Sequence, residues 1–276
     1  MKIALCNEVL AGMSLEKQCE VAAALGYDGL EVAPFTLSDA PEKITSGEAA
    51  RIRATIESFG LIVTGLHWLL VKPEGLSLTD PDAALRARTL DVMSRLTGLC
   101  AELGGMVLVH GSPKQRQVSP GDSHAIALAR LQDGLARVAE SAAANGVIYC
   151  IEPLSPHETD MLNTVAQAAA VVRAINHPNL RTMIDCSAAG LSESESVPDL
   201  IDRWLPTGLI GHIQVNDPNR RGPGQGAMQF APIFSALKRH RYAGAIGVEP
   251  FDYVPDGPGV AAFSAGYIKG LREALA

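Results

Sequence analysis

The regular alternation of short apolar runs with longer amphipathic segments is the feature of this 276-residue chain that most restricts its fold. The apolar runs have the length and composition of buried strands, and a helical pattern follows each of them. Strands that alternate with helices indicate a parallel sheet covered by helices. The expected strands span residues 2–6, 29–33, 61–67, 106–110, 147–152, 181–185, 209–215 and 245–249.

The helical patterns between these runs complete a repeated strand–helix unit. Ser14 is expected to cap the first helix and Gly26 to end it, while Asp80 and Pro81 indicate the start of the third. Eight such units fit a closed α/β barrel, a (β/α)8 TIM barrel in one domain over residues 1–276, better than an open doubly wound sheet. The expected helices span residues 14–26, 46–60, 80–105, 121–145, 163–175, 197–204, 229–239 and 257–275.

Composition narrows the range of partners and compartments. The formal net charge of −7 argues against nucleic acid, because binding to phosphates requires a basic surface. The sequence contains no apolar run of the roughly 18 residues that a membrane span needs, and the polar Asn7 and Glu8 follow the start too soon for a signal peptide. The five cysteines form no paired motif, which indicates reduced thiols and favours the cytoplasm.

Oxygen-bearing side chains stand at the ends of four consecutive expected strands. They are Glu152, Asp185, Gln214 and Glu249. In a barrel these positions face one mouth, where active sites of this fold lie. Three crowded carboxylates repel one another unless a cation neutralises them, and a set of hard oxygen ligands with few imidazoles favours Mn²⁺ or Mg²⁺ over zinc.

Further candidates lie at or beside the same strand ends. His67 and His110 are either hydrogen-bonded wall residues or contacts for a substrate, and His212 precedes Gln214 by two residues. Trp68 offers either a platform for a sugar ring or simple packing at the rim. We include these four side chains among the candidate substrate contacts. Glu31, near the end of the second strand, is either a site residue or an ion-paired residue at the barrel end.

Three loops after strands, at residues 34–43, 71–80 and 112–122, are long enough to act as lids. In the last of them, Lys114 and Arg116 could hold a phosphate or carboxylate, or simply face solvent. The Arg220–Arg221 pair in the loop after the seventh strand is either solvated or supplies one guanidinium that holds substrate oxygens.

Four segments resemble the signature segments of the xylose isomerase-like TIM barrels, a family of sugar isomerases, sugar epimerases and endonucleases. They are IEPLSPHET, MIDCSAAG, GHIQVNDPNRRGPGQG and GVEPF. The resemblance implies that Glu152, Asp185 and Glu249 are metal ligands and that Glu152 and Glu249 move the proton, as in the epimerases. It also implies that Glu158 and Arg220 contact the substrate, and that the chain forms a homo-oligomer.

The sequence departs from the family pattern at informative positions. Gln214 stands where the epimerases and endonucleases place a histidine ligand, as in the hydroxypyruvate isomerase branch, and His212 is the histidine that remains. Ala188 replaces a second family histidine, and Ser155–Pro156 replaces an Asn-Arg pair of the epimerases. These two changes, at positions 188 and 214, remove two zinc ligands of the endonucleases and therefore argue against an endonuclease.

These observations predict a metal-dependent isomerase or epimerase acting on a small sugar or keto-sugar. Proton transfer between two glutamates would pass through an enediolate. A lyase or deglycosidase acting on a keto-sugar with the same metal site is the alternative, because β-elimination also begins with removal of a proton beside a carbonyl. An AP endonuclease-type phosphodiesterase is the third and least favoured hypothesis.

Overall fold

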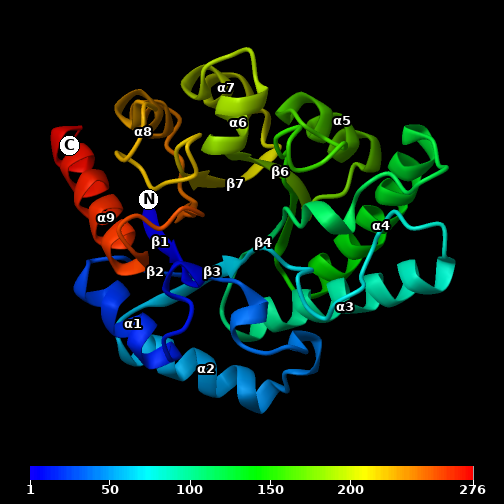
Figure 1. The fold of residues 1–276 in the computed structure, drawn as a ribbon, viewed down its shortest axis with the longest axis horizontal. Coiled ribbons are helices and arrows are strands. Elements are labelled where there is room, and N and C mark those ends of the chain that lie inside the picture. Colours follow the sequence, from blue (N-terminus) through cyan, green and yellow to red (C-terminus); the bar gives the residue numbers. More distant parts are fainter. Residues whose placement is uncertain (276) are drawn as a thin grey trace.

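The computed structural model describes residues 1–275, which form a closed barrel of parallel strands with helices around it (Figure 1). The strands follow one another around the barrel in chain order, and β8 pairs with β1 to close it. This confirms the predicted fold class. The strands are β1 (Lys2–Cys6), β2 (Gly29–Val32), β3 (Ile62–Leu66), β4 (Val107–His110), β5 (Ile148–Ile151), β6 (Leu180–Asp185), β7 (Ile210–Val215) and β8 (Ala245–Val248).

Nine α-helices within residues 1–275 surround the strands. Thr45 and Thr164 begin α2 and α5 with complete capping boxes, in which a side chain at each end of the first turn bonds the backbone of the other. Among the described residues, no helix combines the length and apolar character needed to cross a bilayer. The helices are α1 (Leu15–Ala24), α2 (Ser46–Ser58), α3 (Ala83–Glu102), α4 (His124–Ala144), α5 (Val165–Ile175), α6 (Cys186–Ser192), α7 (Val197–Trp204), α8 (Phe230–Arg239) and α9 (Gly257–Ala274).

Two helices differ from expectation. The predicted start of the third helix at Asp80 is wrong: α3 begins at Ala83, because the Asp82 side chain accepts a hydrogen bond from the amide of Ala84 and caps the helix. Asp80 instead accepts from the amide of Asp82, one step outside the helix. The short helix α6 was not predicted; Asp185 caps it by accepting from the amide of Ala188.

The barrel interior is filled by side chains that alternate along the strands. Val107, Val109, Cys150 and Met183 form a small buried cluster of their own, apart from the larger core between strands and helices. Cys150 in this cluster stands two residues before Glu152 in the chain. The filled interior means that any ligand must bind at an end of the barrel rather than pass through it.

Two of the long loops after strands are tied to each other. The amide of Leu78 donates to the carbonyl of Gln115 at 2.8 Å, and the buried hydroxyl of Thr79 donates to the carbonyl of Gln117 at 2.6 Å. The loop at residues 71–80 therefore supports the loop at residues 112–122, which borders the carboxyl ends of the strands.

Candidate active site

Three carboxylates converge at the carboxyl end of the barrel. Glu152 follows β5, Asp185 ends β6 and Glu249 follows β8, and each offers an oxygen within 4.8 Å of the other two. All three are buried, with 4–5% of each residue exposed. The barrel topology alone brings these residues together, since parallel neighbours end at the same rim.

Burial and mutual repulsion make these carboxylates hold protons. Burial raises the pKa of Glu249 to about 8 and that of Asp185 to about 7. Burial also raises the pKa of Glu152 well above its usual value, and the charges of Glu249 and Asp185 add to the effect. A divalent cation would remove this penalty by supplying the opposite charge.

Gln214 on β7 lies in register with Asp185 on β6 and is completely buried. Its Nε2 donates to Glu31 Oε1 at 2.9 Å, while its Oε1 has no hydrogen-bond partner within residues 1–275. Glu31 thus fixes which end of the amide is the donor and leaves the carbonyl oxygen available to a ligand. Gly247 on β8 makes room for this pair, because a Cβ there would collide with the carboxylate of Glu31.

The predicted metal ligands fit a divalent cation by two observations. Glu249 Oε2 and Gln214 Oε1 are buried oxygens without a hydrogen-bond partner in the described chain. An orphaned buried oxygen costs free energy unless something binds it. Three carboxylates and one amide oxygen form the donor set that Mn²⁺ and Mg²⁺ prefer.

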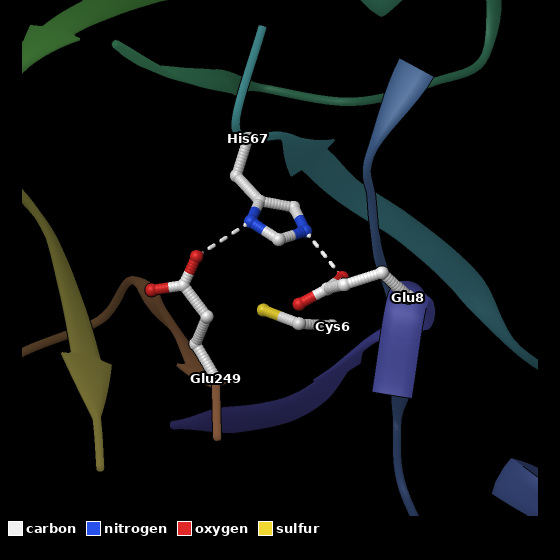
Figure 2. Close-up of side chains that lie close together, drawn as sticks. All are labelled: Cys6, Glu8, His67 and Glu249. Carbon is white, nitrogen blue, oxygen red and sulfur yellow. Dashed lines mark hydrogen bonds and ion pairs between the residues drawn. The ribbon is translucent and has the colours of Figure 1, made fainter. Parts of the chain in front are cut away.

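His67 is completely buried and does not line the cavity that opens beside the carboxylates. Its Nδ1 donates to Glu249 Oε1 at 2.8 Å, and its Nε2 lies 2.9 Å from Glu8 Oε2 (Figure 2). Burial alone would lower the pKa of His67, but its neighbours Cys6, Glu8 and Glu249 together outweigh burial and raise it. The imidazole orients Glu249 and does not reach the open cavity.

The other two predicted histidines are also buried away from the cavity lining. His110 Nδ1 contacts the hydroxyl of Tyr149 at 2.9 Å; burial, aided by the charge of Arg116, lowers the pKa of His110 to about 3 and keeps it neutral. His212 Nε2 bonds Glu31 Oε2 at 2.8 Å. His212 therefore holds the same carboxylate that orients Gln214.

A cavity of about 620 Å³ opens above the carboxylates. Trp68, Glu158 and Arg220, all predicted substrate contacts, line it. The ring of Trp68 meets Phe251 edge to face at 5.7 Å, and the guanidinium of Arg220 lies 4.8 Å above that same phenylalanine ring. Arg220 Nη1 also lies 3.7 Å from Glu158 Oε1. The cavity therefore has a charged floor, one aromatic wall and a pair of opposite charges at its rim.

Asn216 was not predicted as a site residue, whereas Arg116 and Lys114 were candidates with two alternative roles. Asn216 donates to Asp185 Oδ2 at 2.8 Å and accepts from the amide of Ser187, so it fixes the carboxylate in place. Arg116, for which solvent exposure was one prediction, is completely buried and donates to the backbone oxygen of Glu152 at 2.6 Å. Lys114 from the same loop lines the cavity. Asn216 directly follows a predicted strand, and this position could have identified it. No local sequence pattern predicts the path of the loop that buries Arg116.

Comparison with known proteins agrees with this architecture. The family model for the xylose isomerase-like TIM barrel matches residues 19–271. D-psicose 3-epimerase of Agrobacterium fabrum (strain C58 / ATCC 33970) is 32% identical over 240 residues, which cover 84% of this chain and 78% of the relative. L-ribulose 3-epimerase of Mesorhizobium japonicum (strain LMG 29417 / CECT 9101 / MAFF 303099) is 27% identical, covering 87% and 77% respectively.

Solved structures give the same result. The crystal structure of a D-psicose 3-epimerase in the presence of D-fructose superposes with a TM-score of 0.82 at 25% identity, covering 98% of this chain and 99% of that one. These relatives are sugar epimerases, and they confirm the prediction that this chain is an enzyme. On the family match and the barrel described above, the chain belongs to the xylose isomerase-like TIM barrel family.

Proposed function

We propose that this protein is a divalent-metal-dependent ketose 3-epimerase, which inverts the carbon next to the carbonyl of a 2-ketose. The observation that carries the proposal is the buried trio of Glu152, Asp185 and Glu249 at the floor of a sugar-sized cavity. The named relatives, which include a D-psicose and an L-ribulose 3-epimerase, support the reaction class.

Glu152, Asp185, Gln214 and Glu249 would hold the metal, for which Mn²⁺ or Mg²⁺ suits the oxygen donors. When bound, the metal polarises the substrate carbonyl and stabilises negative charge on its oxygen. Its positive charge would also let the three carboxylates stay ionised side by side. Without it their ionisation is unfavourable, because burial raises the pKa of Asp185 to about 7 and that of Glu249 to about 8.

The two glutamates would exchange a proton with the two faces of one carbon. Glu152 and Glu249 come from strands on different sides of the barrel mouth, so a substrate carbon between them can lose a proton to one carboxylate and regain one from the other. His67 bonds Glu249 Oε1 at 2.8 Å and positions that carboxylate. The product is the epimer when the proton returns to the opposite face of the enediolate.

The cavity walls would bind the rest of the sugar. Trp68 and Phe251 present apolar ring surface, which suits the C–H face of a sugar and excludes water from the reacting carbon. Glu158 and Arg220 offer hydrogen bonds to hydroxyl groups at the rim.

Proton exchange in D₂O tests the proposal. Incubation of the Mn²⁺-loaded enzyme with D-fructose, D-psicose or L-ribulose should place deuterium at C3 of both substrate and epimer, as followed by NMR. Glu152→Gln and Glu249→Gln should each lower turnover by about 10²–10⁴-fold, the range in which general acid–base groups contribute. Glu140→Gln, on the exposed side of α4, is the matched control and should retain activity.

Parallel incubations with a keto-glycoside and with a metal chelator separate the alternative chemistries. Release of a leaving group from a keto-glycoside without C3 exchange would favour a lyase. Wild-type rates in either glutamine variant would rule out the two-glutamate scheme, and full activity after exhaustive chelation would rule out the metal.

A further inference from the structure

A second group of side chains that can ligate a metal shares Glu249 with the carboxylate trio. Cys6 ends β1, Glu8 lies in the short 3-10 helix η1 (Asn7–Leu10), and His67 follows β3 (Figure 2). With Glu249, these residues offer ligand atoms that all lie within 4.8 Å of one another. All four are buried, and Glu8, at 3% exposed, has no ready access to water.

Glu8 is poorly accounted for as a structural residue. Neither of its carboxylate oxygens has a hydrogen-bond partner among residues 1–275. Its Oε2 forms an ion pair with His67 Nε2 at 2.9 Å, but within the described residues neither atom has a hydrogen-bond partner, so the contact lacks hydrogen-bond geometry. A buried carboxylate without such bonds needs a positive charge beside it. In the metal-free protein the raised pKa of His67 supplies that charge as a proton on the ring, and a metal ion would supply it in the proton's place.

The hydrogen bond on the other side of His67 determines which of its nitrogens is free. Nδ1 lies 2.8 Å from Glu249 Oε1 and donates to it, so Nε2 is the nitrogen that would release its proton and offer a lone pair when an ion binds. Figure 2 shows this Nε2 directed toward Glu8, with the sulfur of Cys6 below the ring in the view, between the carboxylates of Glu249 and Glu8. A histidine whose second nitrogen donates to a carboxylate is the usual arrangement of a metal-ligating histidine.

We propose that Cys6 Sγ, Glu8 and His67 Nε2 form a second metal site that takes a zinc-class ion, Zn²⁺ or Co²⁺. Thiolate and imidazole ligands select such ions over Mg²⁺, and three protein ligands leave the fourth position of a tetrahedral ion open. This site goes beyond the epimerase assignment, which uses only oxygen ligands.

Glu249 connects the two sites. One of its oxygens accepts from His67, and the other has no hydrogen-bond partner among the described residues. An ion on His67 Nε2 would replace a proton by a larger positive charge close to Glu249. Occupation of the second site is therefore expected to change the basicity of one of the two proposed proton-transfer groups.

Cobalt absorption spectroscopy tests the site without any sugar. Metal-free protein is first saturated with Mg²⁺, which prefers oxygen ligands, and then titrated with Co²⁺. We expect a thiolate-to-cobalt charge-transfer band that saturates at one equivalent and disappears on addition of Zn²⁺. Cys6→Ser should abolish the band, and Glu8→Gln should weaken Co²⁺ binding by more than about 10-fold.

Cys19→Ala is the matched control, because Cys19 is equally buried but lies in α1, away from the cluster. It should leave the band unchanged. X-ray absorption of the zinc-loaded protein should show one sulfur neighbour at about 2.3 Å, and this signal should vanish in Cys6→Ser. Circular dichroism and retained Mn²⁺ binding would show that the Cys6→Ser variant still folds.

A wild-type protein without the band, or a band that persists in Cys6→Ser, would overturn the second site. Because these measurements follow the metal and not turnover, failure of the second site leaves the epimerase assignment untouched. Conversely, absence of C3 exchange would not alter the spectroscopic result.

Discussion

At the scale of single residues, the candidate site depends on side chains whose positions are fixed by buried partners outside the cavity lining. Gln214 is the clearest case, since a neutral amide replaces the histidine that the family resemblance implies at this position. Glu31 accepts from its Nε2, and His212 bonds the other oxygen of Glu31. The direction of one candidate ligand is thus set by two residues on β2 and β7.

Replacement of Gln214 tests this arrangement. Gln214→Ala removes the amide oxygen from the candidate metal site, and we expect Mn²⁺ affinity to fall by at least about 10-fold. It also leaves Glu31 Oε1 buried without its donor, which should lower the free energy of unfolding by about 1–3 kcal/mol. Calorimetric titration and thermal unfolding measure the two effects, with the exposed Gln229→Ala as the control. An unchanged Mn²⁺ affinity would remove Gln214 from the ligand set.

The residues that sequence reasoning identified and those it missed differ in how they are positioned. Glu152, Asp185 and Glu249 stand at strand ends, so the barrel topology predicts that they converge. Cys6 was predicted only as one of five reduced thiols and Glu8 only as a polar residue near the start of the chain. Nothing in the local pattern shows that the barrel brings them against His67.

At the scale of elements, the loop after β3 and the loop after β4 act as one unit. Thr79 and Leu78 bond the backbone of residues 115–117, while Lys114 and Gln117 from that second loop line the cavity. The cavity wall therefore depends on hydrogen bonds made outside it.

Thr79→Val removes the hydroxyl while keeping the shape of the side chain. The carbonyl of Gln117 loses its donor, and we expect a loss of about 1 kcal/mol in the free energy of unfolding. Exchange of the Leu78 amide should become faster and KM for the sugar should rise, whereas Ser235→Ala on the exposed side of α8 should change neither. Unaltered amide exchange would show that the two loops are held together by other contacts.

Element boundaries were predictable where periodicity and caps agree. The expected ranges for β1 and α7 match the structure, and Cys6 and Trp204 end them as predicted. The start of α3 was misplaced because two aspartates, Asp80 and Asp82, both carry a capping side chain. The helix α6 was missed because it spans only seven residues and begins directly after β6, so its apolar residues read as a strand end and a loop.

At the scale of the whole molecule, repeated strand–helix units predict the barrel, and the barrel predicts where chemistry occurs. No sequence pattern predicts the protonation state of the carboxylates at the bottom of the cavity, because it follows from the burial of several charged groups together. Asp185 and Glu249, with pKa values raised to about 7 and 8, bind protons in the folded protein that they release in the unfolded chain.

This proton uptake predicts how stability depends on pH. Because the folded protein binds more protons, the free energy of unfolding of the metal-free enzyme should fall as pH rises from about 5 to 8 and level off above that. Saturating Mn²⁺ should flatten this dependence, since the cation favours the ionised carboxylates. Thermal unfolding across pH 5–9 with and without Mn²⁺ measures it, and Glu249→Gln should show a shallower slope. A metal-free protein that gains stability toward pH 8 would contradict the assigned pKa shifts.

Gly247 restricts which residues can replace one another at neighbouring positions of the barrel during evolution. The absence of a side chain on β8 provides the space that the Glu31 carboxylate occupies beside Gln214. A larger residue at position 247 is compatible only with a shorter one at position 31, and a shorter residue at 31 would release the amide of Gln214. Among homologous sequences, we therefore expect positions 31, 214 and 247 to covary as a triplet across three strands, with an intermediate that changes only one of them at a disadvantage.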